Sequence, residues 1–291
     1  MVTIVKKFGG TSVGDVTRIR NAAKLVSDHI KKTNDKVTVV VSAMAGETNK
    51  LIALAKSCVS EPTLRELDVL VSTGEQVTIA LMAMALNELG HSAKSFTAQQ
   101  AHIATDRNFC KAQIQDIDSL NLKAAIDCGI IPVVAGFQGI DADGDITTLG
   151  RGGSDITAVA IAAALKADAC YIYTDVKGVY STDPRVSSNA RLLPQVCHEE
   201  MLELASLGAK VLHPRSVYFA MAYKIPLCVL STFEPDAGMT WIVKEEELME
   251  KPIVTGITHR TDEAKISVHK LPAESVALST LFQAMAEENI Y

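Results

Sequence analysis

The sequence lacks the features that mark several large classes of protein. Its 291 residues carry a formal net charge of −6, so the chain has no broad excess of positive charge to neutralise nucleic-acid phosphates. The six cysteines lie far apart, without a C-x-x-C pair, and the seven histidines show no metal-ligand spacing. We therefore expect reduced core thiols rather than disulfides, no side chain that ligates a metal, and no nucleic-acid partner.

Targeting and membrane signals are also missing. The N-terminus has no long apolar segment before a small-residue cleavage site, which argues against a secretory signal peptide. The longest apolar stretches are interrupted by Gly, Thr and Glu, so none is expected to span a membrane. Hydrophobic residues make up 48% of the chain and charged residues 21%, which is typical of a globular protein with a sizeable core. The chain is predicted to be cytoplasmic, with no membrane partner.

Two common signatures of nucleotide-binding proteins are absent as well. The sequence contains neither the G-x-x-x-x-G-K-[ST] pattern of P-loop proteins nor the G-x-G-x-x-G pattern of dinucleotide-binding folds. Neither a P-loop NTPase nor a dinucleotide-binding fold is therefore supported.

Apolar β-branched runs alternate with helical patterns along most of the chain. Runs such as 37–41 are continuous, which is typical of strands buried on both faces of a parallel sheet. The alternation predicts an α/β fold, with a mainly parallel sheet sandwiched by helices. The expected strands cover residues 2–5, 37–41, 92–96, 130–134, 169–173 and 227–230, and the expected helices cover 16–30, 48–59, 64–89, 119–128, 154–166, 198–206 and 209–223.

The pattern changes from about Pro252. Residues 253–258 and 265–269 predict two strands and residues 275–287 predict a helix, which gives a β-β-α unit. Forty residues rarely bury enough surface to fold alone, and a strand is expected after the helix, so we expect the start of a longer domain. The predicted domains are therefore 1–245 and 252–291.

Two glycine-rich segments predict anion sites. The segment Lys7–Ser12 follows the strand at 2–5, and its paired glycines aim backbone N–H groups at one point beside a lysine. The segment Gly150–Asp155 places three glycines and Arg151 before a helix, and a guanidinium fork matches a carboxylate or phosphate. A tight turn with an exposed lysine is the alternative for the first segment alone. A helix cap would explain Ser154 and Asp155 of the second segment but not its glycines and Arg151.

Three further features add to this pattern. Glu75 lies in an otherwise apolar helix, where it either contacts a substrate amine or occupies an exposed turn. The polar segment 174–185 follows the strand at 169–173, at the carboxyl end where open α/β sheets bind ligands. It is predicted to hold a nucleotide, with an ordinary polar loop as the alternative. Lys210 either reaches the same phosphates or caps a helix.

Together these segments resemble the aspartate kinases, a family with the amino-acid kinase fold. The resemblance extends over about the first 245 residues, and residues 252–291 resemble the start of the first of two ACT regulatory domains. It implies transfer of the ATP γ-phosphoryl group to the side-chain carboxylate of L-aspartate, giving 4-phospho-L-aspartate on the route to lysine, threonine and methionine. The matching segments are Lys7–Ser12 (KFGGTS), Val41–Met44, Thr73–Glu75, Gly150–Asp155 (GRGGSD), Thr174-Asp175, Asp183–Arg185 and Lys210–Pro214.

The resemblance also implies a role for each candidate residue. Lys7 would neutralise charge on the transferred phosphoryl group, and Asp155 would orient Lys7 and the substrate rather than act as a base. A carboxylate acceptor needs no deprotonation at pH 7. Arg151 would bind the α-carboxylate and Glu75 the α-ammonium. The expected aspartate pocket comprises Thr48, Glu75, Arg151, Gly153 and Ser154, and the expected site for ATP, with Mg²⁺ bridging its phosphates, comprises Lys7, Gly9, Gly10, Ser42, Thr174, Asp175, Tyr180, Arg185 and Lys210.

The resemblance further implies a homo-oligomer and, in the full-length protein, lysine or threonine as a feedback effector. Two alternatives stay open. One is another kinase of this fold, acting on acetylglutamate, carbamate or a nucleotide. The other is a catalytically silent binding protein on the same scaffold. The pairing of Glu75 with Arg151 favours a free amino acid, which carries both an ammonium and a carboxylate.

Overall fold

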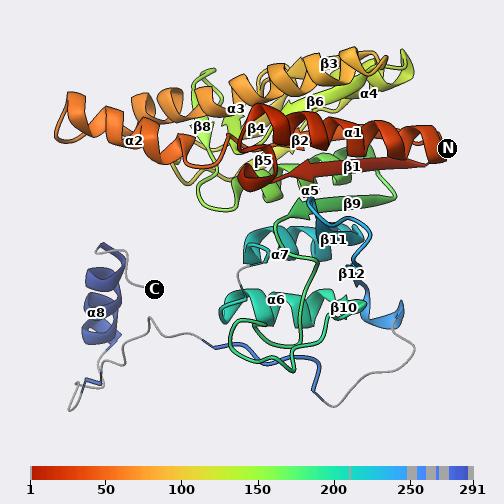
Figure 1. The fold of residues 1–291 in the computed structure, drawn as a ribbon. Coiled ribbons are helices and arrows are strands. Elements are labelled where there is room, and N and C mark those ends of the chain that lie inside the picture. The colour runs from red at the N-terminus through yellow and green to blue at the C-terminus, as the bar shows by residue number, and fades with distance from the viewer. Residues whose placement is uncertain (1, 210, 248–253, 260–266, 269–274, 288–291) are drawn as a thin grey trace. The chain divides into compact units, whose positions relative to one another are not determined.

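The computed structural model of the chain describes all residues except 1, 210, 248–253, 260–266, 269–274 and 288–291 (Figure 1). The chain divides into two compact units, Met1–His259 and Arg260–Tyr291. Each unit is described by itself.

The first unit is built on an eight-stranded sheet with the order β10-β12-β11-β9-β1-β2-β6-β3 (Figure 1). Neighbouring strands are parallel except for the antiparallel pair β11–β12, which confirms the predicted mainly parallel α/β fold. Each of the six strands predicted within residues 1–245 is present, whereas β10 and β12 were not predicted. The strands are β1 (Thr3–Phe8), β2 (Lys36–Val41), β3 (Ala93–Phe96), β6 (Ile131–Ala135), β9 (Ala169–Thr174), β10 (Gln195–Cys197), β11 (Leu227–Ser231) and β12 (Met239–Val243).

Helices cover both faces of this sheet. Buried side chains of α1 and α3 pack with Ile4 and Phe8 of β1, whereas those of α4 to α7 pack with Val5. Successive side chains of a strand point to opposite faces, so β1 contributes to both layers of the core. The helices are α1 (Val16–Thr33), α2 (Glu47–Cys58), α3 (Leu64–Glu88), α4 (Leu120–Asp127), α5 (Gly153–Leu165), α6 (His198–Ser206) and α7 (Pro214–Tyr223).

Helix α7 begins later than the sequence pattern predicted. The expected helix over 209–223 starts only at Pro214. Gly208 has a φ of 125°, which takes the chain out of the helical region, and His213 is an extended N-cap residue. Proline fits the first helical position because its missing N–H would be unpaired there in any case.

A second, four-stranded sheet has the order β5-β4-β7-β8 and was not predicted. It comprises β4 (Ile103–Thr105), β5 (Ile114–Ile117), β7 (Gln138–Ile140) and β8 (Ile146–Thr148). Strands β7 and β8 form an antiparallel hairpin, and the chain leaves β8 directly into the glycine-rich segment at 150–155. This sheet therefore carries one of the predicted anion sites.

Helix α3 is long and apolar enough, by length and composition alone, to cross a membrane, which the sequence interpretation had not anticipated. Half of its apolar window is buried inside the protein. It also carries two fully or almost fully buried carboxylates, Asp68 and Glu75. These features are typical of the core helix of a folded domain.

The last residues of the first unit differ from the prediction. A strand was expected over 253–258, but the described residues 254–259 form none. Instead, Ile257 N donates to Ser181 O at 2.7 Å and Thr255 Oγ1 donates to Glu200 Oε1 at 2.6 Å. The segment is thus held by scattered bonds rather than by a neighbouring strand.

The second unit contains one described element, α8 (Ser275–Glu287), at the residues where a helix was predicted. Most of the strand expected at 265–269 lies outside the described residues.

Candidate active site

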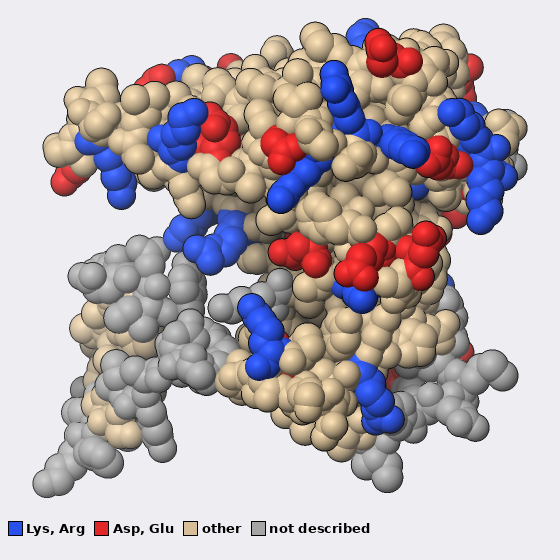
Figure 2. Space-filling model, viewed as in Figure 1, with Lys and Arg blue, Asp and Glu red and all other residues tan. Residues whose placement is uncertain are grey.

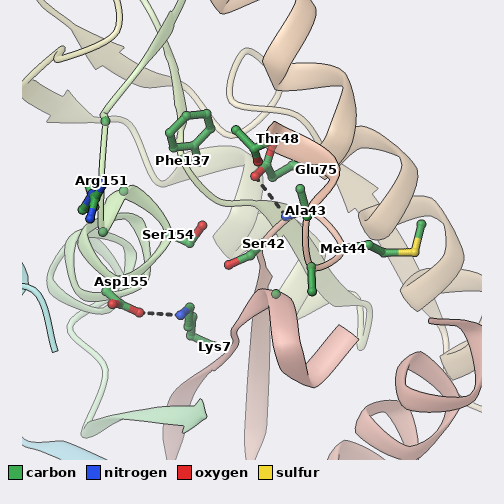
Figure 3. A pocket seen from close by; sticks show the side chains of 16 residues that line it. Lys7, Ser42, Ala43, Met44, Thr48, Glu75, Phe137, Arg151, Ser154 and Asp155 are labelled. Carbon is green, nitrogen blue, oxygen red and sulfur yellow. Dashed lines mark hydrogen bonds and ion pairs between the residues drawn. The ribbon is translucent and has the colours of Figure 1, made fainter. Parts of the chain in front are cut away.

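A cavity of about 280 Å³ lies where β1 and β2 end and α5 begins (Figure 3). It collects side chains from segments that are far apart in the sequence. The predicted residues that line it are Lys7, Gly10, Ser42, Thr48, Glu75, Arg151, Gly153, Ser154 and Asp155.

Lys7 and Asp155 form an ion pair in this cavity. Lys7 is the penultimate residue of β1, and Asp155 lies in the first turn of α5. Lys7 Nζ is 2.5 Å from Asp155 Oδ1, and the two side chains are only 10% and 14% exposed (Figure 3). Weak screening by solvent makes such a pair stronger than a surface pair, so each charge holds the other in place.

The glycine turn after β1 makes room for this lysine. A Cβ on Gly9 would lie 3.4 Å from Lys7 Nζ, and one on Gly10 would lie 3.0 Å from Ala43 O. Gly9 does not line the cavity, and its N–H donates to Tyr173 O at 3.2 Å. The N–H of Gly9 is thus engaged within the turn, whereas Gly10 lines the cavity.

Ser12 anchors the glycine turn to the core of the protein. Its side chain is fully buried, and its Oγ shares a 2.6 Å hydrogen bond with Thr232 Oγ1. Residues 10–14 have the G-x-S-x-G spacing of a hydrolase nucleophile, but such a nucleophile must be exposed. Ser12 therefore has a structural role.

Glu75 is buried in the cavity wall, which rules out the exposed helix turn considered from the sequence. Its side chain is 2% exposed, and Oε1 accepts a 2.9 Å hydrogen bond from Ala43 N (Figure 3). Oε2 is buried without a hydrogen-bond partner. Burial raises the pKa of Glu75 to about 7, although the Ala43 N–H opposes this shift. A positively charged group placed in the cavity would relieve the cost of this unpaired oxygen.

The segment Gly150–Asp155 needs its glycines. Gly150 and Gly152 have φ values of 73° and 74°, a region that other residues rarely adopt. A Cβ on Gly152 would lie 2.4 Å from His213, and one on Gly153 would lie 2.9 Å from Phe137. Arg151 is exposed, and among the described residues no carboxylate forms an ion pair with it. Its guanidinium is available to an anionic ligand.

The other predicted ATP residues lie outside the cavity. Thr174 is the last residue of β9, the strand next to β1, and Asp175, Tyr180 and Arg185 follow it in the chain. Arg185 is engaged with Asp183, whose pKa its guanidinium lowers to about 2. Because β9 runs parallel to β1 and Tyr173 pairs with Phe8, Thr174 and Asp175 lie at the edge of the sheet where β1 ends, but none of the four residues lines the cavity. Lys210 lies outside the described residues.

Several cavity residues were missed by the sequence interpretation. Phe137 lines the cavity and has a φ of 72°, and Ala43 supplies the N–H that holds Glu75. Both follow a buried strand at its carboxyl end, which is the signal that could have identified them. The other lining residues for which no role was predicted are Met44, Ala45 and Gly46, whereas Gly150 and Gly152 belong to the predicted anion-binding segment.

Charge at the site is local. On the face seen in Figure 2, basic and acidic side chains are interspersed rather than gathered into one broad patch. Within the cavity, Lys7 and Arg151 supply positive charge, and Glu75 and Asp155 supply negative charge. The arrangement suits a ligand that carries charges of both signs.

Comparisons with known proteins agree with this chemistry. The model of the amino acid kinase family matches residues 2–231. An aspartate kinase of Pseudomonas putida is 55% identical over 272 residues, which are 94% of this chain and 66% of the relative. An aspartokinase of a Bacillus species is 52% identical over 291 residues, which are 100% of this chain and 70% of the relative.

A solved structure gives the same picture. Aspartokinase III of Escherichia coli, in complex with aspartate and ADP, is 31% identical and superposes with a TM-score of 0.76 over 84% of this chain and 65% of the other. The present chain thus spans about two thirds of the length of these relatives.

Proposed function

The chain belongs to the amino acid kinase family and, within it, to the aspartate kinases; from this premise we propose that it phosphorylates the side-chain carboxylate of L-aspartate with ATP. The observation that carries the proposal is the pair formed by Glu75, with its unpartnered buried oxygen, and Arg151, with its free guanidinium, in one cavity. A free amino acid presents an ammonium and a carboxylate to these two groups. The product would be 4-phospho-L-aspartate, a precursor of lysine, threonine and methionine.

Binding of aspartate would use charges of both signs. The substrate ammonium would contact Glu75 Oε2 and stabilise the ionised form of this buried carboxyl group. The α-carboxylate would contact Arg151, which can bind it with two parallel hydrogen bonds. Gly153 and Ser154 lie in the first turn of α5, where backbone N–H groups favour an anion, and the Thr48 hydroxyl completes the pocket.

The transfer step itself would need little covalent chemistry. An oxygen of the substrate side-chain carboxylate forms a bond to the γ-phosphorus while the bond to the β,γ-bridging oxygen breaks, and ADP leaves. No proton moves, because the carboxylate is already ionised at neutral pH. Lys7 would neutralise charge on the transferred group, and Asp155, 2.5 Å away, would hold Lys7 in position.

ATP would lie against Gly10 and Ser42 in the cavity and, by family resemblance, against Gly9, Thr174, Asp175, Tyr180, Arg185 and Lys210. Among the described residues, no group of three or more His, Cys, Asp or Glu side chains is placed to hold a metal ion. Magnesium is commonly bound through substrate phosphates with few protein ligands, so Mg²⁺ would arrive on ATP and neutralise its phosphate charge.

Regulation would involve the C-terminal region. Aspartokinase III of Escherichia coli has been solved in complex with lysine and aspartate. For this protein we extend the proposal to residues 252–291 as the start of an ACT-like regulatory domain, to lysine or threonine as effector, to a homo-oligomer and to a cytoplasmic location.

The decisive experiment measures hydroxamate formation from aspartate and ATP, together with ADP release over a panel of acceptors. The panel contains aspartate, N-acetylglutamate, carbamate and UMP. We expect the parent chain to prefer aspartate. Preference for N-acetylglutamate would overturn the choice of substrate, because an acylated amine cannot bind Glu75 as an ammonium. Absence of turnover with every acceptor would support the catalytically silent alternative.

A further inference from the structure

Arg215 occupies an unusual position for a cation. It is the second residue of α7, where the positive end of the helix disfavours positive charge. Among the described residues, no carboxylate forms an ion pair with it. Its guanidinium instead donates to two backbone carbonyls, with Nη1 2.8 Å from Leu149 O and Nη2 3.1 Å from Ala112 O. Contacts with remote backbone carbonyls therefore stabilise Arg215 at this position, whereas the helix itself disfavours a cation there.

Leu149 is the last residue before the glycine-rich segment 150–155. The four backbone polar groups of residues 148 and 149 are all paired, and Arg215 supplies the last of the four partners. Thr148 N donates to Asp68 Oδ2 at 2.8 Å, Thr148 O accepts from Ala112 N at 2.9 Å, Leu149 N donates to Phe137 O at 2.8 Å, and Leu149 O accepts from Arg215. Hydrogen bonds to four different residues therefore hold the backbone immediately before the glycine-rich segment.

The start of α7 also meets the segment at a second point. The His213 ring lies so close to Gly152 that any Cβ there would be 2.4 Å from its Cβ and Cγ. His213 Nδ1 accepts from Arg215 N at 3.3 Å, which orients the ring. Residues 213–215 therefore form a corner that contacts both the base and the middle of the segment.

We propose that Arg215 is a positioning residue for aspartate binding: it fixes the segment Gly150–Asp155 and, through it, the guanidinium of Arg151. Three glycines give this segment unusual conformational freedom, which the tertiary contacts must remove before Arg151 can meet the substrate carboxylate accurately. Arg215 does not line the cavity, so it acts through the segment and not on the substrate. The inference rests on the proposed function, because it takes aspartate as the ligand of Arg151.

Steady-state kinetics of the full 291-residue chain would test this role. Arg215→Met removes both hydrogen bonds, whereas Arg215→Lys keeps a cation without the planar fork. We expect Arg215→Met to raise the KM for aspartate about tenfold or more, since small misplacements of a binding group cost up to about 10²-fold. The KM for ATP should stay within about twofold of the parent, and Arg215→Lys should be intermediate.

Arg65→Met provides a matched control. Arg65 Nη2 lies 2.7 Å from Asp145 Oδ1, just before β8 begins. Arg65 therefore contacts the beginning of β8, whereas Arg215 contacts the residue that follows its end. The KM of the Arg65→Met variant for aspartate should remain within about twofold of that of the parent. An Arg215→Met variant with a lower Tm but a KM for aspartate equal to that of Arg65→Met would show a purely structural role and overturn the inference.

Hydrogen exchange without substrate separates this inference from the proposed function. We expect faster exchange of residues 148–155 in Arg215→Met than in Arg65→Met or the parent. Equal exchange in all three proteins would overturn the positioning role. If the parent chain does not phosphorylate aspartate, the proposed function fails, and the exchange measurement still decides whether Arg215 fixes the segment. Should Arg215→Met not fold, Arg215→Gln retains one donor and serves in both measurements.

Discussion

Lys6 and Lys7 are neighbours on β1, yet they face opposite layers of the protein. Lys7 points toward α5 and forms the 2.5 Å ion pair with Asp155 at the cavity. Lys6 points toward the layer of α1 and is 1% exposed. Its Nζ donates to Tyr173 Oη at 3.1 Å and lies 5.8 Å and 5.3 Å from the ring centroids of Tyr171 and Tyr173.

The surroundings of Lys6 and Lys7 have different effects on their ammonium groups. Among the described residues, no carboxylate lies within ion-pair distance of Lys6, and burial lowers its pKa to about 7 despite the opposing charge of Asp35. The aromatic rings offset only part of the cost of removing an ammonium from water. A single step along the strand thus separates an ion-paired lysine at the cavity from a buried amine whose pKa is lowered to about 7.

Replacement of Lys7 should have the largest effect. We expect Lys7→Ala to lower kcat by about 10²–10³, because it removes one preorganised charge from the transferred phosphoryl group. Lys6→Met is the matched control and should retain kcat within about threefold. Hydroxamate formation under saturating substrates measures both. A Lys7→Ala variant with kcat within threefold of the parent would contradict the assigned role.

Glu75 sharpens the comparison because it is another buried group that titrates near neutral pH, but it faces the cavity. Its pKa of about 7 means that the carboxylate needed to bind the substrate ammonium is lost as the pH falls below 7. We expect kcat/KM for aspartate to fall about tenfold per pH unit below this value. Glu75→Gln should bind aspartate weakly and lose this pH dependence. An unchanged profile in Glu75→Gln would assign the titration to another group.

Lys6 should instead appear in the pH dependence of stability. Its pKa is lower in the folded chain than in the unfolded one, so between pH 7 and 10 the unfolded chain binds more protons. The contribution of Lys6 to the free energy of unfolding should therefore rise with pH above 7, by at most about 1.4 kcal/mol per unit, and stay flat below it. Urea unfolding at pH 6 to 9 should show a smaller rise for Lys6→Met than for the parent. Equal slopes would mean that Lys6 remains charged in the fold.

Replacement of a third lysine of the same sheet, Lys36, should have the smallest effect on activity and stability. Lys36 of β2 pairs in register with Thr3 of β1, and its Nζ lies 3.0 Å from Asp127 Oδ1 in a pair exposed by 38% and 72%. Exposed pairs contribute about 0–1 kcal/mol. Lys36→Gln should thus change the free energy of unfolding by less than about 1 kcal/mol and leave kcat unchanged. A larger loss would show that this edge of the sheet is less solvated than its exposure indicates.

Much of the fold follows from local patterns. The continuous run at 37–41 predicted β2, and the apolar periodicity at 64–89 predicted α3 almost to the residue. The strands of the second sheet were missed because they span only three or four residues each, too few to show a period. Helix α7 was predicted too early because Gly208 and the Pro214 start were overlooked.

The candidate site was predictable where a residue type carries its own chemistry. The paired glycines, Lys7 and Arg151 stand out because they follow strand and precede helix patterns at which anions bind. Phe137 and Ala43 carry no such mark, and only their place after a buried strand connects them to the cavity.

The sequence by itself determined the alternation of strands and helices, the two glycine turns and the opposite directions of Lys6 and Lys7, because each depends on backbone preferences over a few residues. Only the tertiary structure decided that Lys6 is buried against Tyr171 and Tyr173, that Glu75 is buried against Ala43, 32 residues away, and that Arg215 holds Leu149, 66 residues away. Burial, charge and pKa depend on distances through space. Those distances are fixed only when remote segments pack together.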